Sequence, residues 1–108
     1  MKGVILEKAF ANRSEFDAAV KGVEKALGKN VVRVRYALDY DSTGDPGVFF
    51  KIVLPDASVT KDNLWNTTQK VAFLIEQKLD PVGLWGVYPY YRFRSQSEQE
   101  AMQEASWA

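Results

Sequence analysis

The sequence contains no cysteine and no histidine among its 108 residues. Without cysteine there can be no disulfide framework and no thiolate chemistry. Without histidine, the usual general base at neutral pH and the commonest transition-metal ligand are both missing. No glycine-rich phosphate-binding loop is present either. We therefore expect a protein that is not an enzyme and that has no cofactor.

Net charge is also lacking, because 14 Lys and Arg residues balance 14 Asp and Glu residues. No global positive field draws the molecule to nucleic acid or to an anionic membrane, so any such binding must be local. No apolar run reaches the ~18 residues of a membrane span, and no signal-peptide pattern is present. From these absences we expect a cytoplasmic protein that does not bind membranes.

The chain does contain enough apolar residues for a small globular domain. Hydrophobic residues make up 46% and charged residues 26%, which is ordinary for a soluble fold. A chain of this length can bury a modest core, so we expect one domain. We assign that domain to residues 1–94 and treat residues 95–108, which carry Glu but no Lys or Arg, as an acidic C-terminal tail.

Residues 31–54 show the clearest local pattern, two strand-like runs joined by a loop. In residues 31–40 the even positions are apolar and most odd positions are charged, the alternation typical of a half-buried strand. Residues 41–47 are rich in turn-forming types. Residues 48–54 are again β-branched and aromatic, and they stop at Pro55. The pattern predicts a β-hairpin whose even positions face the core.

Helical spacing of apolar residues predicts two helices, over residues 14–27 and 61–79. Asn12 or Ser14 can cap the first helix, and Gly28 can end it. The sequence leaves residues 1–11 open, as a short strand or as helix.

A third strand is expected over residues 84–93, the most aromatic part of the chain. Pro89 favours an edge position or a bulge for this strand, because proline cannot donate to a ladder. The order α-β-β-α-β predicts an α+β two-layer sandwich, with an antiparallel three-stranded sheet and both helices on one face. The expected core is Phe16, Val20, Val23, Val34, Tyr36, Leu38, Phe50, Ile52, Leu64, Val71, Ile75, Val87 and Phe93.

The opposite face of this sheet would be open, and strand parity gathers cations and aromatic side chains on it. The candidate interface residues are Arg33, Arg35, Phe49, Lys51, Tyr88, Tyr90, Arg92 and Arg94. One hypothesis is a homodimer or a protein-docking surface, since Tyr, Trp and Arg are enriched at protein interfaces. The alternative is a platform for single-stranded nucleic acid. We favour a protein partner because the chain is neutral overall.

The acidic tail is a further candidate to cover this face. A segment tethered beside Arg92 and Arg94 has a high effective concentration for a basic surface. Trp107 could anchor it on its own sheet or on a neighbour's in an exchanged dimer. A solvated terminus is the alternative interpretation.

The hairpin loop carries three candidate oxygen ligands for a metal: Asp39, Asp41 and Asp45. The run Asp-x-Asp-x-Thr-Gly matches the first half of an EF-hand calcium loop, but Phe50 stands at the twelfth position, where a bidentate Glu is needed. Residues 37–43 also resemble the first motif of the haloacid-dehalogenase phosphohydrolases. That resemblance implies Asp39 as nucleophile and Asp41 as acid/base. We favour polar residues that satisfy a hairpin loop, and expect no metal.

Two further stretches carry a resemblance to a protein group. They are Asp-Ser-Thr-Gly-Asp-Pro-Gly-Val-Phe-Phe over 41–50, and Phe-Arg-Ser-Gln-Ser-Glu-Gln over 93–99 together with the final Trp-Ala. They resemble a group of small, mostly uncharacterised bacterial proteins, some of which look like the smaller member of a two-gene toxin–antitoxin unit. The resemblance names no catalytic residue and implies a role in binding another protein.

Overall fold

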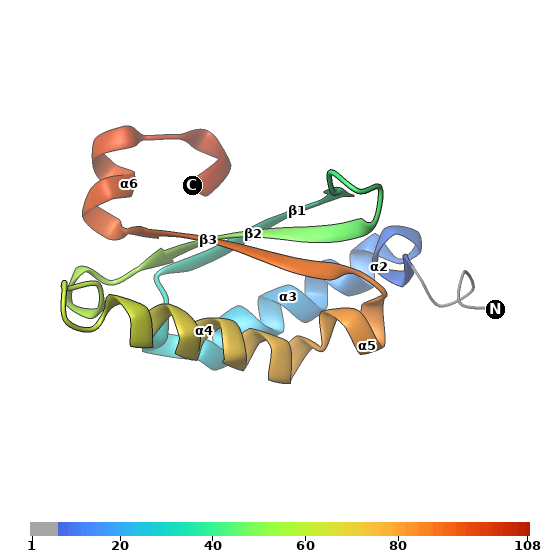
Figure 1. The fold of residues 1–108 in the computed structure, drawn as a ribbon, viewed down its shortest axis with the longest axis horizontal. Helices are drawn as coiled ribbons and strands as arrows, with labels where there is room; N and C mark the ends of the chain where they lie inside the picture. The colour runs from blue at the N-terminus through green and yellow to red at the C-terminus, as the bar shows by residue number, and fades with distance from the viewer. Residues whose placement is uncertain (1–6) are drawn as a thin grey trace.

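The computed structural model describes residues 7–108. Its elements, in chain order, are α2 (Lys8–Ala11), α3 (Arg13–Leu27), η1 (Gly28–Asn30), β1 (Arg33–Tyr40), β2 (Pro46–Leu54), η2 (Asp56–Ser58), α4 (Leu64–Leu79), α5 (Pro81–Trp85), β3 (Tyr88–Ser95), α6 (Gln96–Met102) and η3 (Ala105–Trp107). Helices α3 and α4 lie along one face of the sheet, and α6 lies over the other (Figure 1). Of the undecided residues 1–11, those from Lys8 onward are helical, and residues 1–6 lie outside the described residues.

The strands of residues 7–108 form a mixed sheet in the order β1-β2-β3. β1 and β2 are an antiparallel hairpin in which Tyr36 lies opposite Phe50. β3 runs parallel to β2, with Tyr91 opposite Phe50. The α+β class is therefore confirmed, but the prediction of a fully antiparallel sheet is wrong for the β2–β3 pair. The reason is that α4 carries the chain back along the sheet before β3 begins, which is the crossover that parallel pairing requires.

The third strand begins at Tyr88, later than predicted, because residues 81–85 form the short helix α5. Asp80 adopts a left-handed conformation with φ 51°, and its carboxylate accepts a hydrogen bond from Gly83 N at 3.1 Å. Pro81 occupies the first helical position, where its missing N–H has no cost. The Asp-Pro pair thus both ends α4 and starts α5. Pro89 lies on an edge strand, as predicted.

The predicted helices are present, with changed ends. Helix α3 runs from Arg13 to Leu27 and ends at Gly28, whose positive φ of 54° suits a glycine. Asn12 does not cap it through its side chain, which donates instead to Lys8 O at 3.2 Å. Helix α4 begins at Leu64, three residues after the predicted start.

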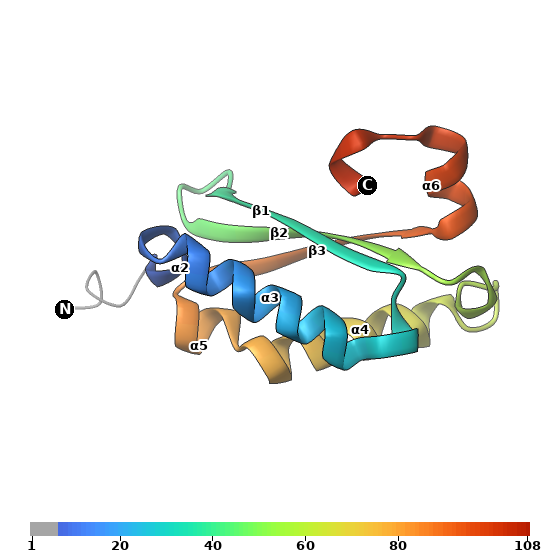
Figure 2. The ribbon, with the colours of Figure 1, turned by 180° about the vertical axis from the view of Figure 1, so that it is seen from behind.

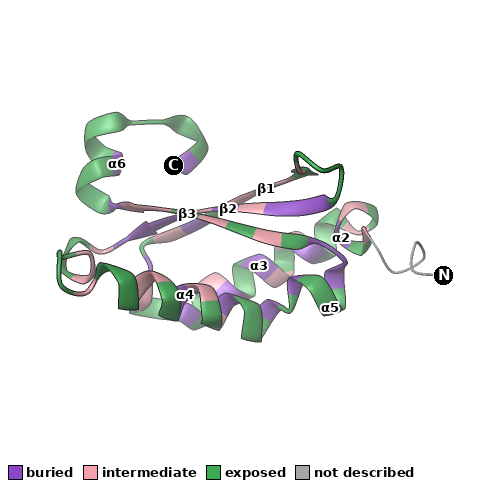
Figure 3. Cartoon of the chain, viewed as in Figure 1, coloured by how far each residue is buried: buried purple, intermediate pink, exposed green. Residues whose placement is uncertain are grey.

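The core lies between the sheet and helices α3 and α4, as the strand parity predicted (Figure 3). Even positions of β2 are buried there, including Phe50 and Ile52. The prediction is wrong for Leu64, which is 46% exposed at the start of α4. Trp85 was not expected in the core, but it packs edge-on against Phe16, with ring centroids 5.1 Å apart.

Candidate interface on the outer sheet face

The outer sheet face is the surface that points away from α3 and α4. The register of the two ladders places all of the candidate interface residues on it, in rows that cross the strands. Arg35, Lys51 and Arg92 share one such row. Ala37, Phe49 and Tyr90 share the next.

The C-terminal segment, residues 95–108, folds back over one half of this face (Figure 1). The Trp107 side chain is 1% exposed, and Val53 of β2 is fully buried although its position lies on the outer face. The Arg94 guanidinium lies 4.3 Å from the centre of the indole ring and that of Arg92 lies 5.9 Å away. These are cation–π distances. Trp107 thus closes a small second core against the sheet.

Polar contacts join the C-terminal segment to both edge strands. Arg33 Nε donates to the Trp107 carbonyl oxygen at 2.8 Å, and Arg35 Nε donates to that of Ala108 at 2.7 Å. On the β3 side, Arg94 forms an ion pair with Glu104. This hydrogen-bonded charge pair holds the pKa of Glu104 below its ordinary value. The segment therefore ties β1 to β3 across the face.

The C-terminal segment is also ordered by its own local structure. Ser95 and Glu98 form a reciprocal capping box that starts α6. The buried Gln99 side chain accepts from Arg94 at 3.1 Å and donates to the Glu104 carbonyl at 2.9 Å. These bonds fix the turn that follows α6. They explain why a short acidic segment adopts one path over the sheet.

The other half of the outer face stays open, and we call it the aromatic half. The Phe49 and Tyr90 rings stack with centroids 4.9 Å apart and planes 13° apart. Gly47 makes room for the pair, since a Cβ there would lie 3.1 Å from the Tyr90 ring. Tyr88 and Tyr90 are 46% and 40% exposed. A surface cavity of about 280 Å³ lies beside them, lined by Ala37, Asp39, Phe49, Phe50, Lys51, Tyr90 and Arg92.

The loop carboxylates are engaged in holding the hairpin loop. Asp41 accepts hydrogen bonds from Tyr90 Oη at 2.6 Å, Thr43 Oγ1 at 2.7 Å and Asp45 N at 2.9 Å. The Tyr90 hydroxyl, followed by Thr43, lowers the pKa of Asp41 to about 2. Asp39 accepts from Tyr40 N at 2.7 Å. Within residues 7–108, His, Cys, Asp and Glu side chains form no cluster of three that could hold a metal ion.

No family model matches this chain, and no curated protein or solved structure is significantly similar to it. Within residues 7–108, no helix is both long enough and apolar enough to cross a membrane. The function must therefore be argued from the arrangement of the side chains.

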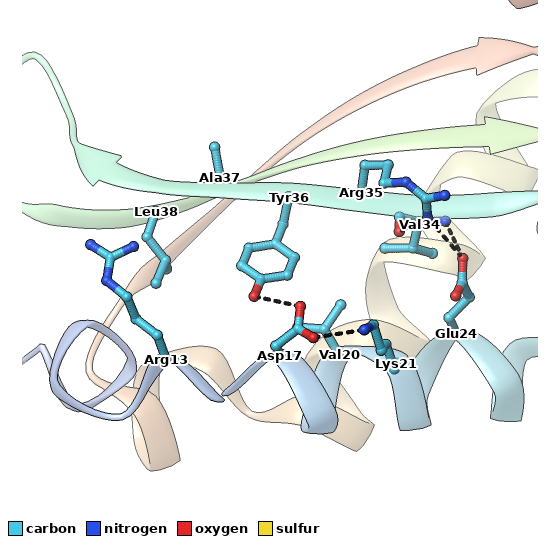
Figure 4. A pocket seen from close by; sticks show the side chains of 10 residues that line it. All are labelled: Arg13, Asp17, Val20, Lys21, Glu24, Val34, Arg35, Tyr36, Ala37 and Leu38. Atoms are coloured by element: carbon cyan, nitrogen blue, oxygen red, sulfur yellow. Dashed lines mark hydrogen bonds and ion pairs between the residues drawn. The ribbon is translucent and has the colours of Figure 1, made fainter. Parts of the chain in front are cut away.

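A second concave site, which was not predicted from the sequence, is the groove between α3 and β1 (Figure 4). This groove has a volume of about 680 Å³. Tyr36 Oη donates to Asp17 at 2.9 Å, and Lys21 pairs with the same carboxylate at 2.9 Å. Burial and the Asp17 hydrogen bond raise the pKa of Tyr36 to about 12. Further along, Glu24 accepts from Val34 N at 2.7 Å. The signal in the sequence is the row of charged residues Asp17, Lys21 and Glu24, which helical spacing places on one side of α3.

Proposed function

We propose that this chain is a non-enzymatic protein-interaction module that binds a larger partner protein through the aromatic half of its outer sheet face. The observation that carries the proposal is the stacked Phe49–Tyr90 pair beside exposed Tyr88 and Arg92, at a cavity that the C-terminal segment leaves open. Tyr and Arg are the side chains that most often dominate binding energy at interfaces. Large rigid rings also lose little conformational entropy when they become buried.

The chemistry of the aromatic half suggests what the partner presents. The cavity has apolar walls from Ala37 and Phe49, with the cations Lys51 and Arg92 at its border. A partner segment that inserts an apolar side chain and sets a carboxylate beside Arg92 would match both features. The resemblance to the smaller members of toxin–antitoxin pairs supports a larger protein in this role.

Single-stranded nucleic acid is less well supported as the ligand. The C-terminal segment already supplies hydrogen-bond acceptors to Arg33, Arg35 and Arg94, so phosphates would have to share these guanidinium groups with it. Phe49 and Tyr90 stack on each other, which leaves fewer ring faces for bases.

The experiment is capture from the native host with the tagged protein as bait, followed by calorimetry with the purified partner. The Tyr88→Ala variant should weaken the affinity by about 30-fold or more, as expected for a hot-spot residue. The matched control is Phe73→Ala, which removes a 63% exposed aromatic side chain from α4, on the other side of the molecule. This control should bind as the wild type does. The proposal is wrong if no partner is captured, or if Tyr88→Ala binds the captured partner with unchanged affinity.

A further inference from the structure

The strand β1 has an open edge above the groove that it forms with α3 (Figures 2 and 4). Within residues 7–108, β1 pairs on one side only, with β2. The amides of Val34 and Tyr40 donate to side-chain carboxylates and not to β2. Since N–H groups alternate sides along a strand, the even positions of β1 point their amides outward. The backbones of Tyr36 and Leu38 therefore present donors and acceptors along this edge.

On the outer sheet face, the charged residues of β1 would lie opposite residues of the other charge in a second, antiparallel β1 strand. The order along the strand is Arg35, Ala37, Asp39, which is cation, small residue, anion. An antiparallel second copy centred on Ala37 sets Arg35 opposite Asp39 of that copy, and the two-fold axis repeats the pair. This register also sets Arg33 opposite Asp41, whereas a register shifted by two residues keeps only one kind of Arg–Asp pair, Arg33 with Asp39 or Arg35 with Asp41, and sets the remaining charge opposite Ala37. Within each described chain Arg35 Nε donates to Ala108 O at 2.7 Å, and Nη1 donates to Val34 O at 3.2 Å and lies 3.7 Å from Glu24, so Nη2 is the group that would donate to the carboxylate of the second copy.

The same register suits the backbone and the inner face. Arg35, Ala37 and Asp39 fall at the closely spaced positions, where antiparallel Cα atoms approach to ~4.5 Å, and two Ala side chains fit at the axis. Tyr36 falls opposite Leu38 of the second copy, at positions that exchange both backbone hydrogen bonds. These two side chains are half-buried and line the α3–β1 groove, so those of the second copy would extend its apolar wall.

We propose that a second copy of this chain docks on the open edge of β1, so that the two sheets become one continuous sheet across a two-fold axis at Ala37. Pairing of this kind is how exposed strand edges recruit another chain. The proposal goes beyond the partner-binding function, because it uses the edge of the sheet and leaves Tyr88 and Tyr90 on β3 exposed in each copy.

The first test is sedimentation over a wide concentration range. The wild type should form dimers. Asp39→Lys should weaken the dimer by about tenfold or more, because both cross-strand pairs become like-charge pairs. The matched control is Asp62→Lys, the same charge change at an exposed position before α4, and it should dimerise as the wild type does.

A complementation test checks the register itself. Arg35→Glu alone should also weaken the dimer, because the introduced carboxylate then lies opposite the carboxylate of Asp39 in the second copy. An equimolar mixture of Arg35→Glu with Asp39→Lys should restore dimers, since each contact then joins opposite charges. Restoration also shows that both variants are folded.

Four results would overturn the proposal. The first is a wild type that stays monomeric, and the second is a dimer that keeps its full affinity in both single variants. The third is a mixture of the two variants that fails to associate. The fourth is a dimer that is lost on deletion of residues 95–108 but is unaffected by the charge reversals. The last result would indicate exchange of the C-terminal segment. None of these tests measures partner capture through Tyr88, so the two proposals can fail separately.

Discussion

The burial of Trp107 allows the docking of the C-terminal segment to be tested with one substitution. Burying a Trp side chain removes about 150–250 Å² from water, worth about 4–6 kcal/mol at ~25 cal/mol per Å². Measured Trp→Ala or Phe→Ala losses in cores are about 3–5 kcal/mol. In Trp107→Ala the segment can detach and leave no cavity, which limits the loss. We therefore expect the free energy of unfolding to fall by about 2–4 kcal/mol.

Thermal melts followed by circular dichroism measure this loss. In a domain of about 100 residues, 1 kcal/mol lowers Tm by about 4–8 °C, so Trp107→Ala should melt roughly 8–30 °C below the wild type. The matched control is Trp65→Ala, because Trp65 is 72% exposed on α4. Its substitution should change stability by no more than about 0.5 kcal/mol. If the two variants melt together, Trp107 contributes no docking energy and the reasoning is refuted.

Three further predictions concern titratable and capping groups. Arg94 lowers the folded pKa of Glu104, so this pair stabilises the docked segment above the unfolded pKa and is lost as the pH falls through the folded pKa. The indole N–H resonance of Trp107 should therefore shift toward its unfolded position in acid, and Glu104→Gln should show part of that shift at neutral pH. The same acid-induced shift in the wild type and in Glu104→Gln would contradict this prediction. Burial, followed by the hydrogen bond to Asp17, raises the folded pKa of Tyr36 to about 12, so the neutral phenol contributes its full stability below pH ~10 and this contribution is lost as the pH rises toward 12. Melting temperatures across that window should fall less steeply in Tyr36→Phe than in the wild type, and parallel curves would contradict the assignment. Ser95→Ala removes the cap of α6 and should cost about 1 kcal/mol in urea unfolding, whereas Ser42→Ala in the exposed hairpin loop should cost nothing measurable.

The sequence was sufficient to orient the hairpin but not to pair the third strand. Alternation has a period of two, so one buried face determines which way Val34 and Phe50 point. The same parity assigns Tyr88 and Arg92 to the outer face, where the ladders place them. The alternation of apolar residues does not indicate whether β3 runs parallel or antiparallel to β2, because its direction depends on the path of α4.

Helical periodicity identified the buried stripe of α4 but overstated its width. Val71 and Ile75 are buried as predicted, while Leu64, which we had also expected in the core, is 46% exposed, and the nearby Trp65 and Phe73 are 72% and 63% exposed. A period of 3.6 residues defines a direction around the helix, and the width that is covered depends on what packs against it. Leu64 is in the first turn, where neighbours along the helix lie on one side only.

The contacts of the C-terminal segment could not be predicted from its acidic composition. Arg33 and Arg35 bind main-chain carbonyls of the segment, which every sequence possesses. Glu98 is used in the capping box, and Glu104 supplies the ion pair to β3. Charge complementarity therefore indicated the right surface, while backbone geometry and the Trp107 ring determine how the segment lies.

The two ladders of the central strand β2 differ greatly in the length of chain that separates the paired strands. The β1–β2 ladder needs only the short loop after Tyr40, whereas the β2–β3 ladder must bring Leu54 and Ser95 together after all of α4. The entropy of loop closure has to be overcome before distant contacts contribute, so we expect the hairpin to form early and β3 to be added to it later. The C-terminal segment contacts both β1 and β3, so it can dock only when both ladders exist. We therefore expect the burial of Trp107 to accompany the last step of folding.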